Sequence, residues 1–71
     1  MTLAERLIEL RRSHKLTQRQ VYTGIDVAPL VYQRYEYGRE PAYKQLMALA
    51  NYFNVSLDYL TGRTDNPEIN R

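Results

Sequence analysis

The side chains that could do chemistry in this 71-residue chain are amides and guanidinium groups rather than nucleophiles or metal ligands. The sequence has no cysteine and one histidine, His14, so it offers no ligand cluster for zinc or another transition metal. It has no glycine-rich phosphate loop and no nucleophile with a neighbouring base. We therefore expect no catalytic residues, no metal and no cofactor, and we look for a binding function instead.

The amides and guanidinium groups are frequent between residues 16 and 39, where the sequence predicts two short helices in close succession. Thr17 and a glutamine three positions later form a capping box that begins the first helix. Gly24 and Asp26 bracket its end, and Pro29 begins the next helix because proline is pre-organised for a first helical position. Helices joined by so short a turn cross steeply. This helix-turn-helix arrangement leaves the second helix free to enter a DNA major groove.

Residue spacing separates the inward and outward faces of that second helix, predicted over about residues 29–37. Val27, Tyr32 and Tyr35 have the spacing of a buried face. The outer face holds Pro29, Leu30, Gln33 and Arg34, with Val31 at its margin. There the guanidinium could pair with guanine, the amide with adenine or a phosphate, and the two aliphatic side chains with thymine methyl groups. Leu30 and Val31 could equally complete the core or a protein interface.

The charge of the chain is small but uneven. The net charge is +2, and residues 1–44 hold eight of the ten Lys and Arg but five of the eight Asp and Glu. The basic part therefore includes the two short helices. This distribution indicates a polyanion partner at that end, although a solvated charged surface explains it equally well.

The rest of the sequence predicts three more helices and one small core, so the expected fold class is all-α with five helices. The first helix runs from Leu3 to about His14 after Thr2, the fourth follows Pro41, and the last follows Ser56 and stops at Gly62. The residues predicted to face inward are Leu3, Leu7, Ile8, Leu10, Leu16, Val21, Ile25, Tyr43, Leu46, Met47, Leu49, Ala50, Tyr52, Phe53, Leu57 and Leu60. Those predicted to face solvent on the first helix are Glu5, Arg6, Glu9 and Arg12.

A domain over residues 1–62 and a flexible tail over residues 63–71 are expected, because the tail has little to bury. A core of this size supplies only a few kcal/mol, so we expect a partner subunit. No apolar run is long enough to span a membrane, and neither a signal peptide nor a cysteine is present. These features predict a cytoplasmic protein.

Several short motifs, in their order and spacing, resemble the Cro/repressor-type helix-turn-helix domain, or XRE family, of bacterial and phage regulators. They are Leu10-Arg11, Leu16-Thr17-Gln18, Tyr35-Glu36-Tyr37-Gly38, Pro41, Leu46, Leu49-Ala50 and the run from Tyr52 to Leu60. The resemblance extends from Leu3 to about Gly62. It implies a five-helix DNA-binding fold.

The resemblance also implies roles for individual residues. Arg11 and Glu36 match an ion pair that ties the first helix to the end of the recognition helix. The implied phosphate contacts are Thr17, Gln18, Tyr37 and Arg39, and the implied base-facing residues are Pro29, Leu30, Gln33 and Arg34. Family members commonly bind double-stranded DNA as homodimers on half-sites about one helical turn apart. For the dimer surface we predict the last short helix and the tail, with Tyr59 and Leu60.

Three positions depart from the family pattern. Tyr22 replaces a small alanine where the two short helices cross, so its ring must lie along the surface or open the helices slightly. Asp26 replaces a glycine, at a strain on the order of 1 kcal/mol if its backbone is left-handed. Ala28 replaces the usual serine or threonine cap.

The sequence thus predicts a DNA-binding transcriptional regulator, most simply a repressor, with no enzymatic activity. An alternative is a protein-interaction module on the same fold, such as an antitoxin or anti-repressor, binding through Tyr22, Leu30 and Val31. The operator and the regulated genes do not follow from the sequence. The chain could also be the N-terminal piece of a longer regulator.

Overall fold

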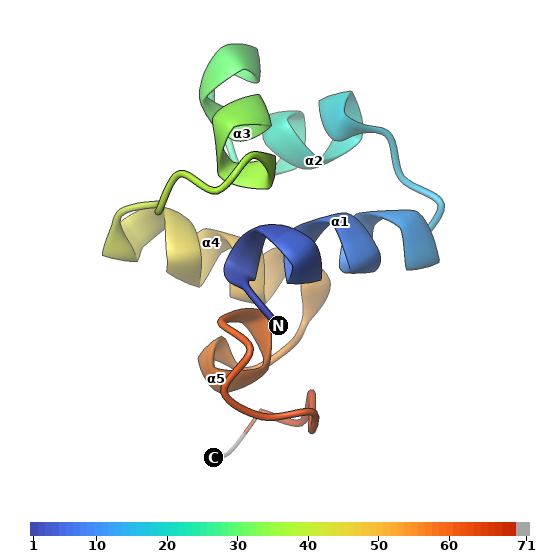
Figure 1. Cartoon of the computed structure of the whole chain (residues 1–71). Coiled ribbons are helices and arrows are strands. Elements are labelled where there is room, and N and C mark those ends of the chain that lie inside the picture. Colours follow the sequence, from blue (N-terminus) through green and yellow to red (C-terminus); the bar gives the residue numbers. More distant parts are fainter. Residues whose placement is uncertain (70–71) are drawn as a thin grey trace.

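The computed structural model describes residues 1–69, in which the chain forms five α-helices and no strand. The helices are α1 (Leu3–Ser13), α2 (Gln18–Gly24), α3 (Pro29–Glu36), α4 (Tyr43–Phe53) and α5 (Leu57–Leu60). In Figure 1, α2 and α3 form one end of the molecule, α1 and α4 lie across its middle, and α5 forms the opposite end. None of the helices in residues 1–69 is long and apolar enough to cross a membrane. The predicted five-helix, all-α fold is confirmed.

Side-chain caps begin three of the helices at the predicted positions. Thr2 and Thr17 each form a reciprocal capping box, with Glu5 and Gln20 respectively. Ser56 accepts the third amide of α5 with its hydroxyl. Each cap satisfies an amide that has no partner within its helix, which matters most for the two shortest helices, α2 and α5.

All five helices end with a left-handed residue followed by an amide that bonds back to the last turn. The left-handed residues are Lys15, Asp26, Gly38, Asn54 and Gly62, with φ from 55° to 117°. The closing bonds, such as Leu16 N–H to the Arg11 carbonyl at 2.9 Å, are those of the Schellman motif. Left-handed backbone at Asp26 agrees with the sequence analysis, and Asn54 is a residue type that tolerates this conformation. Lys15 was not anticipated, because a lysine side chain does nothing to favour that conformation.

One small core joins the helices, and each of the five contributes to it. The buried apolar residues are Leu7, Leu10, Val21, Tyr32, Tyr35, Leu49, Ala50, Phe53, Val55 and Leu60. Tyr32 is fully buried and packs edge-on against Tyr35, with the ring centroids 6.3 Å apart. Because Tyr32 and Tyr35 lie on the inner face of α3, the core fixes which face of that helix is turned outward.

The prediction that Arg6 faces solvent is wrong, because this residue is only 4% exposed. Its guanidinium lies 3.8 Å from the centroid of the Tyr59 ring and donates to Glu9, Asp65 and the Thr64 carbonyl. Arg6 lies three residues after one leucine of the apolar stripe and four before another. Its stem therefore packs with the stripe while its charged end reaches acceptors.

One other prediction about burial is wrong, and one residue that was correctly predicted to face inward was also assigned to the dimer surface. Tyr43, expected to broaden the core, is 71% exposed, because it is the first residue of α4 and lies at the edge of the packed region. Leu60, expected in a dimer surface, is fully buried in the core of its own chain. The neighbouring Tyr59 is half-buried beneath Arg6.

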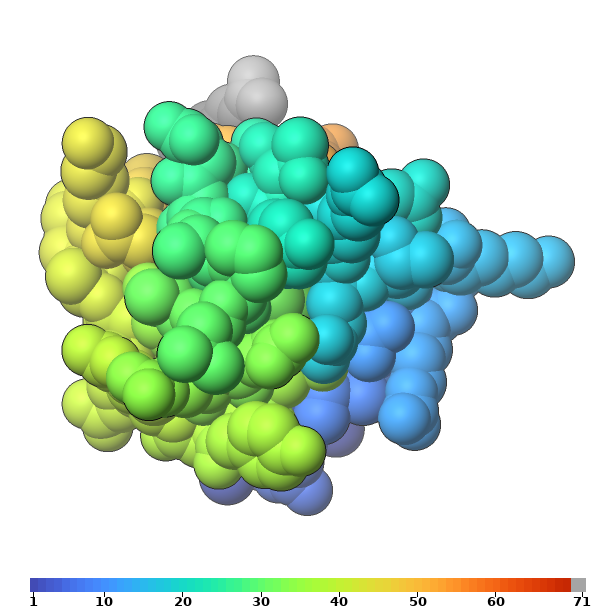
Figure 2. Space-filling view, turned by 90° about the horizontal axis from the view of Figure 1, so that it is seen from above, coloured from blue at the N-terminus to red at the C-terminus, as the bar shows by residue number. Residues whose placement is uncertain are grey.

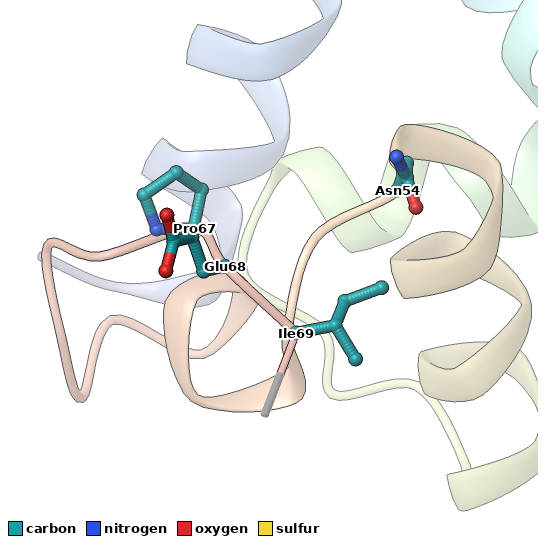
Figure 3. Close-up of a pocket in the computed structure, with 4 residues that line it drawn as sticks. All are labelled: Asn54, Pro67, Glu68 and Ile69. Carbon is teal, nitrogen blue, oxygen red and sulfur yellow. The ribbon is translucent and has the colours of Figure 1, made fainter. Parts of the chain in front are cut away.

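The chain after α5 folds back on the domain as far as the described residues extend. The Pro67 carbonyl accepts the Ser56 amide at 3.1 Å, and Arg6 binds the segment at residues 64 and 65. A shallow hollow between this segment and the end of α4 is lined by Asn54, Pro67, Glu68 and Ile69 (Figure 3). Residues 70 and 71 of the predicted tail lie outside the described residues.

Candidate nucleic-acid interface

The outer face of α3 is exposed at the end of the molecule opposite α5. Figure 1 shows α3 running across α2, and Figure 2 shows both helices on the face seen from above. Pro29, Leu30 and Arg34 are exposed there, Gln33 is half-buried, and Leu30 is 58% exposed. Val31 packs partly against the core. The four residues predicted to face bases therefore lie on the exposed side of α3.

The polar side chains on the outer face of α3 are available to a ligand. Neither the Gln33 amide nor the Arg34 guanidinium is hydrogen-bonded to another side chain or carbonyl in residues 1–69. Arg39, which follows α3, is also exposed, and so is the acid Asp26 in the turn before α3. The face thus presents donors and positive charge to a ligand.

Glu36, the last residue of α3, joins three helices through hydrogen bonds. Arg11 of α1 donates to it twice, from Nε to Oε2 at 2.7 Å and from Nη2 to Oε1 at 3.2 Å. Gln18, the first residue of α2, donates from Nε2 to Oε1 at 3.1 Å. The side chains of Arg11 and Glu36 are 16% and 6% exposed. This nearly buried, bidentate pair fixes the start of α2 and the end of α3 relative to α1.

The surroundings of Glu36 alter its protonation. Burial by itself would raise the pKa of this carboxyl, but the hydrogen bonds from Arg11 and Gln18, with the Arg11 charge, outweigh it, so the pKa is lowered. Burial raises the pKa of the nearby Tyr32 hydroxyl, and the Glu36 charge raises it further. That hydroxyl faces the ion pair without a hydrogen bond of standard geometry. Glu36 therefore remains an anion at neutral pH, and Arg11 balances its charge.

The resemblance implies a phosphate contact at Gln18, but the side chain of this residue turns inward. Its amide donates to Glu36 at the end of α3, and the capping box at Thr17 fixes the first turn of α2 in which it lies. Thr17 itself is exposed, and its hydroxyl accepts a hydrogen bond from the backbone amide of Gln20. Both residues lie at the start of α2, but their side chains already have partners inside the domain.

Tyr37 and Arg39 follow α3 directly and are exposed, Tyr37 to 92%. The Arg39 amide bonds back to the Arg34 carbonyl at 2.9 Å, so the turn at Gly38 holds both residues beside the end of α3. Tyr37 also borders a small surface hollow of about 220 Å³ between α1, α2 and α3. Its lining residues are Ile8, Arg11, Arg12, Gln18, Glu36 and Tyr37.

Tyr22 lies where α2 and α3 cross, and its side chain is half-buried. Its ring lies 6.5 Å from that of Tyr32, at an interplanar angle of 51°. The ring therefore packs against the core from the side instead of occupying an alanine-sized gap. Of the three residues expected in an alternative protein interface, only Leu30 is largely exposed.

Comparison with known proteins bears directly on this arrangement. A family model described as helix-turn-helix matches residues 7–60, which include all of α2, α3, α4 and α5. The chain belongs to the XRE-type helix-turn-helix family. A solved structure, the crystal structure of a transcriptional regulator from Listeria innocua, matches with a TM-score of 0.80 and 32% sequence identity, over 86% of this chain and 58% of that one.

Two relatives from Bacillus subtilis (strain 168) carry the name uncharacterized HTH-type transcriptional regulator. YobD is 40% identical over 65 residues, and YqaE is 37% identical over 67 residues. The matches cover 90% and 93% of this chain but 58% of each relative. This XRE-type chain is therefore a DNA-binding domain of the kind found in transcriptional regulators, and it spans less than two thirds of the relatives' length.

Sequence reasoning missed two features of this XRE-type domain. The Gln18–Glu36 bond joins residues far apart in sequence, and no local pattern reveals that the amide turns inward. The burial of Arg6 did leave a signal, because its position coincides with the apolar stripe of α1. A charged residue at an inward position of an amphipathic helix indicates a buried partner elsewhere.

Proposed function

We propose that this protein is a sequence-specific transcriptional regulator, most simply a repressor that occludes a promoter, and that it inserts α3 into the DNA major groove. One observation carries the proposal. The outer face of α3 is exposed and presents an unengaged guanidinium and amide, while the inner face is locked by Tyr32 and Tyr35. A helix held this way can bring side chains to base edges in a fixed register.

In this proposal Arg34 pairs with guanine and Gln33 contacts adenine or a phosphate, with Pro29 and Leu30 beside them. Tyr37 and Arg39 contact the phosphate backbone from the turn after α3, and residues 17 and 18 do so from the start of α2. Because the Gln18 side chain is bound to Glu36, its contribution comes from the backbone amide. Phosphate contacts would set the position of α3, and base contacts would give the sequence preference.

One recognition helix reads only a few base pairs, so we also propose a homodimer on two half-sites about one helical turn apart. The buried Leu60 is excluded from the dimer surface. Binding chromosomal or phage DNA requires the protein to act in the bacterial cytoplasm.

The test begins with selection of an operator from random duplexes, followed by affinity measurements on the selected site and on random DNA. Arg34→Ala should weaken specific binding by roughly 1–3 kcal/mol and leave random binding much less affected. Arg39→Ala should weaken both and reduce the salt slope by about one.

Lys44→Ala is the matched control, because Lys44 is an exposed cation on α4, outside α2 and α3 and outside the helix and tail predicted for the dimer surface. It should change neither affinity. Equal losses on specific and random DNA for Arg34→Ala would rule out a base-reading role.

The exposed Leu30 supports a second candidate, a protein-interaction module such as an antitoxin or anti-repressor. It predicts a stoichiometric protein partner that is lost on Leu30→Glu. The exposed Arg34, one helical turn from Leu30, favours DNA over an apolar protein surface.

A further inference from the structure

We infer that Leu30 is a specificity-determining residue that reads the 5-methyl group of thymine. This inference rests on the proposed function, because it concerns what the exposed face of α3 recognises. An exposed leucine is not unusual by itself. Here it lies on the same face as Arg34, one helical turn away, among side chains available to a ligand.

The start of α3 offers no other means of distinguishing bases with side chains. The residues there are Val27, Ala28, Pro29, Leu30 and Val31. None of these side chains can donate or accept a hydrogen bond, and Ala28 makes no side-chain cap. Apolar contact is therefore the only direct readout that this half of the helix can make.

Among the base edges in the major groove, the thymine methyl group is the apolar feature. Leu30 is 58% exposed, whereas Val27 and Val31 pack partly against the core. Leu30 is thus the aliphatic side chain with most surface left to bury on a ligand. Protein partners fit less well, because the charged Arg34 is exposed one helical turn away on the same face.

Helix geometry limits where the thymine can lie. Leu30 and Arg34 are four residues apart, which is about 6 Å along the helix axis. Base pairs stack about 3.4 Å apart. In each half-site, the thymine read by Leu30 therefore lies within about two base pairs of the guanine read by Arg34.

The experiment replaces each thymine of the selected operator, one at a time, by deoxyuridine, which lacks only the methyl group. One burial of a methyl group is worth about 0.8 kcal/mol, so wild-type affinity should fall roughly fourfold at one position per half-site. Leu30→Ala should remove that difference, whereas Arg34→Ala should keep it while losing preference for the nearby guanine. In a second measurement, 5-methylcytosine at that position should bind better than cytosine by a similar factor.

The failures of the two proposals are distinguishable. If an operator is selected but no deoxyuridine substitution weakens binding, or if the effect persists in Leu30→Ala, the methyl readout is wrong and the regulator remains. If selection yields no preferred sequence, the proposed function fails and the methyl readout fails with it.

Discussion

Glu36 is the residue on which the geometry of the candidate interface depends most. It accepts hydrogen bonds from Arg11 and Gln18, so a single carboxylate connects the last turn of α1, the first turn of α2 and the end of α3. Removing one member of such a nearly buried pair leaves the other charge without compensation. The pair therefore positions the helices that carry the proposed DNA contacts, without needing to touch DNA.

At this scale the ion pair predicts a pH dependence of stability. Because the pKa of Glu36 is lower in the folded protein than its ordinary value of 4.5, the carboxylate stabilises the fold above that value. The stabilisation is lost as pH falls through the lowered pKa. Glu36→Gln should be less stable at pH 7, and its free energy of unfolding should change less between about pH 5 and pH 2.

Urea unfolding at a series of pH values measures this effect. Glu40→Gln is the matched control, because Glu40 is an exposed glutamate outside the pair, and it should keep the wild-type slope. A wild-type slope in Glu36→Gln would show that Glu36 is not the group responsible.

The helices are short, and their ends determine much of their stability. Each of the five ends at a left-handed residue, but only Gly38 and Gly62 are glycines. A side chain in the left-handed region is strained by roughly 1–2 kcal/mol, less for aspartate and asparagine. The turn between α2 and α3 holds its geometry despite this strain at Asp26, because the Val27 amide bonds back to the Tyr22 carbonyl at 2.9 Å.

Lys15→Gly should therefore stabilise the protein by roughly 0.5–1 kcal/mol, after allowance for the greater freedom of glycine in the unfolded chain. Asp26→Gly should give a smaller gain. Gly38→Ala is the opposite control: a Cβ there would meet no neighbouring atom, so its expected loss of stability is purely conformational. Thermal unfolding measures all three. Destabilisation by Lys15→Gly would contradict a left-handed backbone conformation at residue 15.

At the scale of the whole molecule, the segment after α5 is tied to α1. Arg6 holds Thr64 and Asp65 and stacks on Tyr59, and Met1 approaches Gly62 closely enough to exclude a Cβ there. The folded unit therefore extends past residue 62. α5 has only four residues and depends on these neighbours for its position.

Arg6 should contribute far more to the free energy of unfolding than its exposed partner Asp65. Arg6→Ala removes a nearly buried side chain and should destabilise the protein by roughly 2–4 kcal/mol. Asp65→Ala removes a fully exposed carboxylate, whose ion pair is screened by solvent, and should change stability far less. Similar losses in the two variants would contradict a packing role for Arg6. Chemical unfolding at pH 7 gives both values.

The sequence predicted local features well and long-range contacts less well. Caps at Thr2, Thr17 and Ser56 act within one helical turn, so each helix start could be placed. The outward face of α3 followed from residue spacing. The inward turn of Gln18 and the contact of Arg6 with Tyr59 depend on helices distant in sequence, and spacing along one helix carries no information about them.

DNA binding by the α2–α3 face is tested most directly with random-sequence duplex DNA. Fluorescence anisotropy measures the affinity between about 50 and 200 mM salt. We expect binding in the micromolar range that weakens steeply with salt, because exposed arginines on the α2–α3 face would displace counterions from phosphates. Absence of binding even at 50 mM salt would contradict a DNA-binding role for this face.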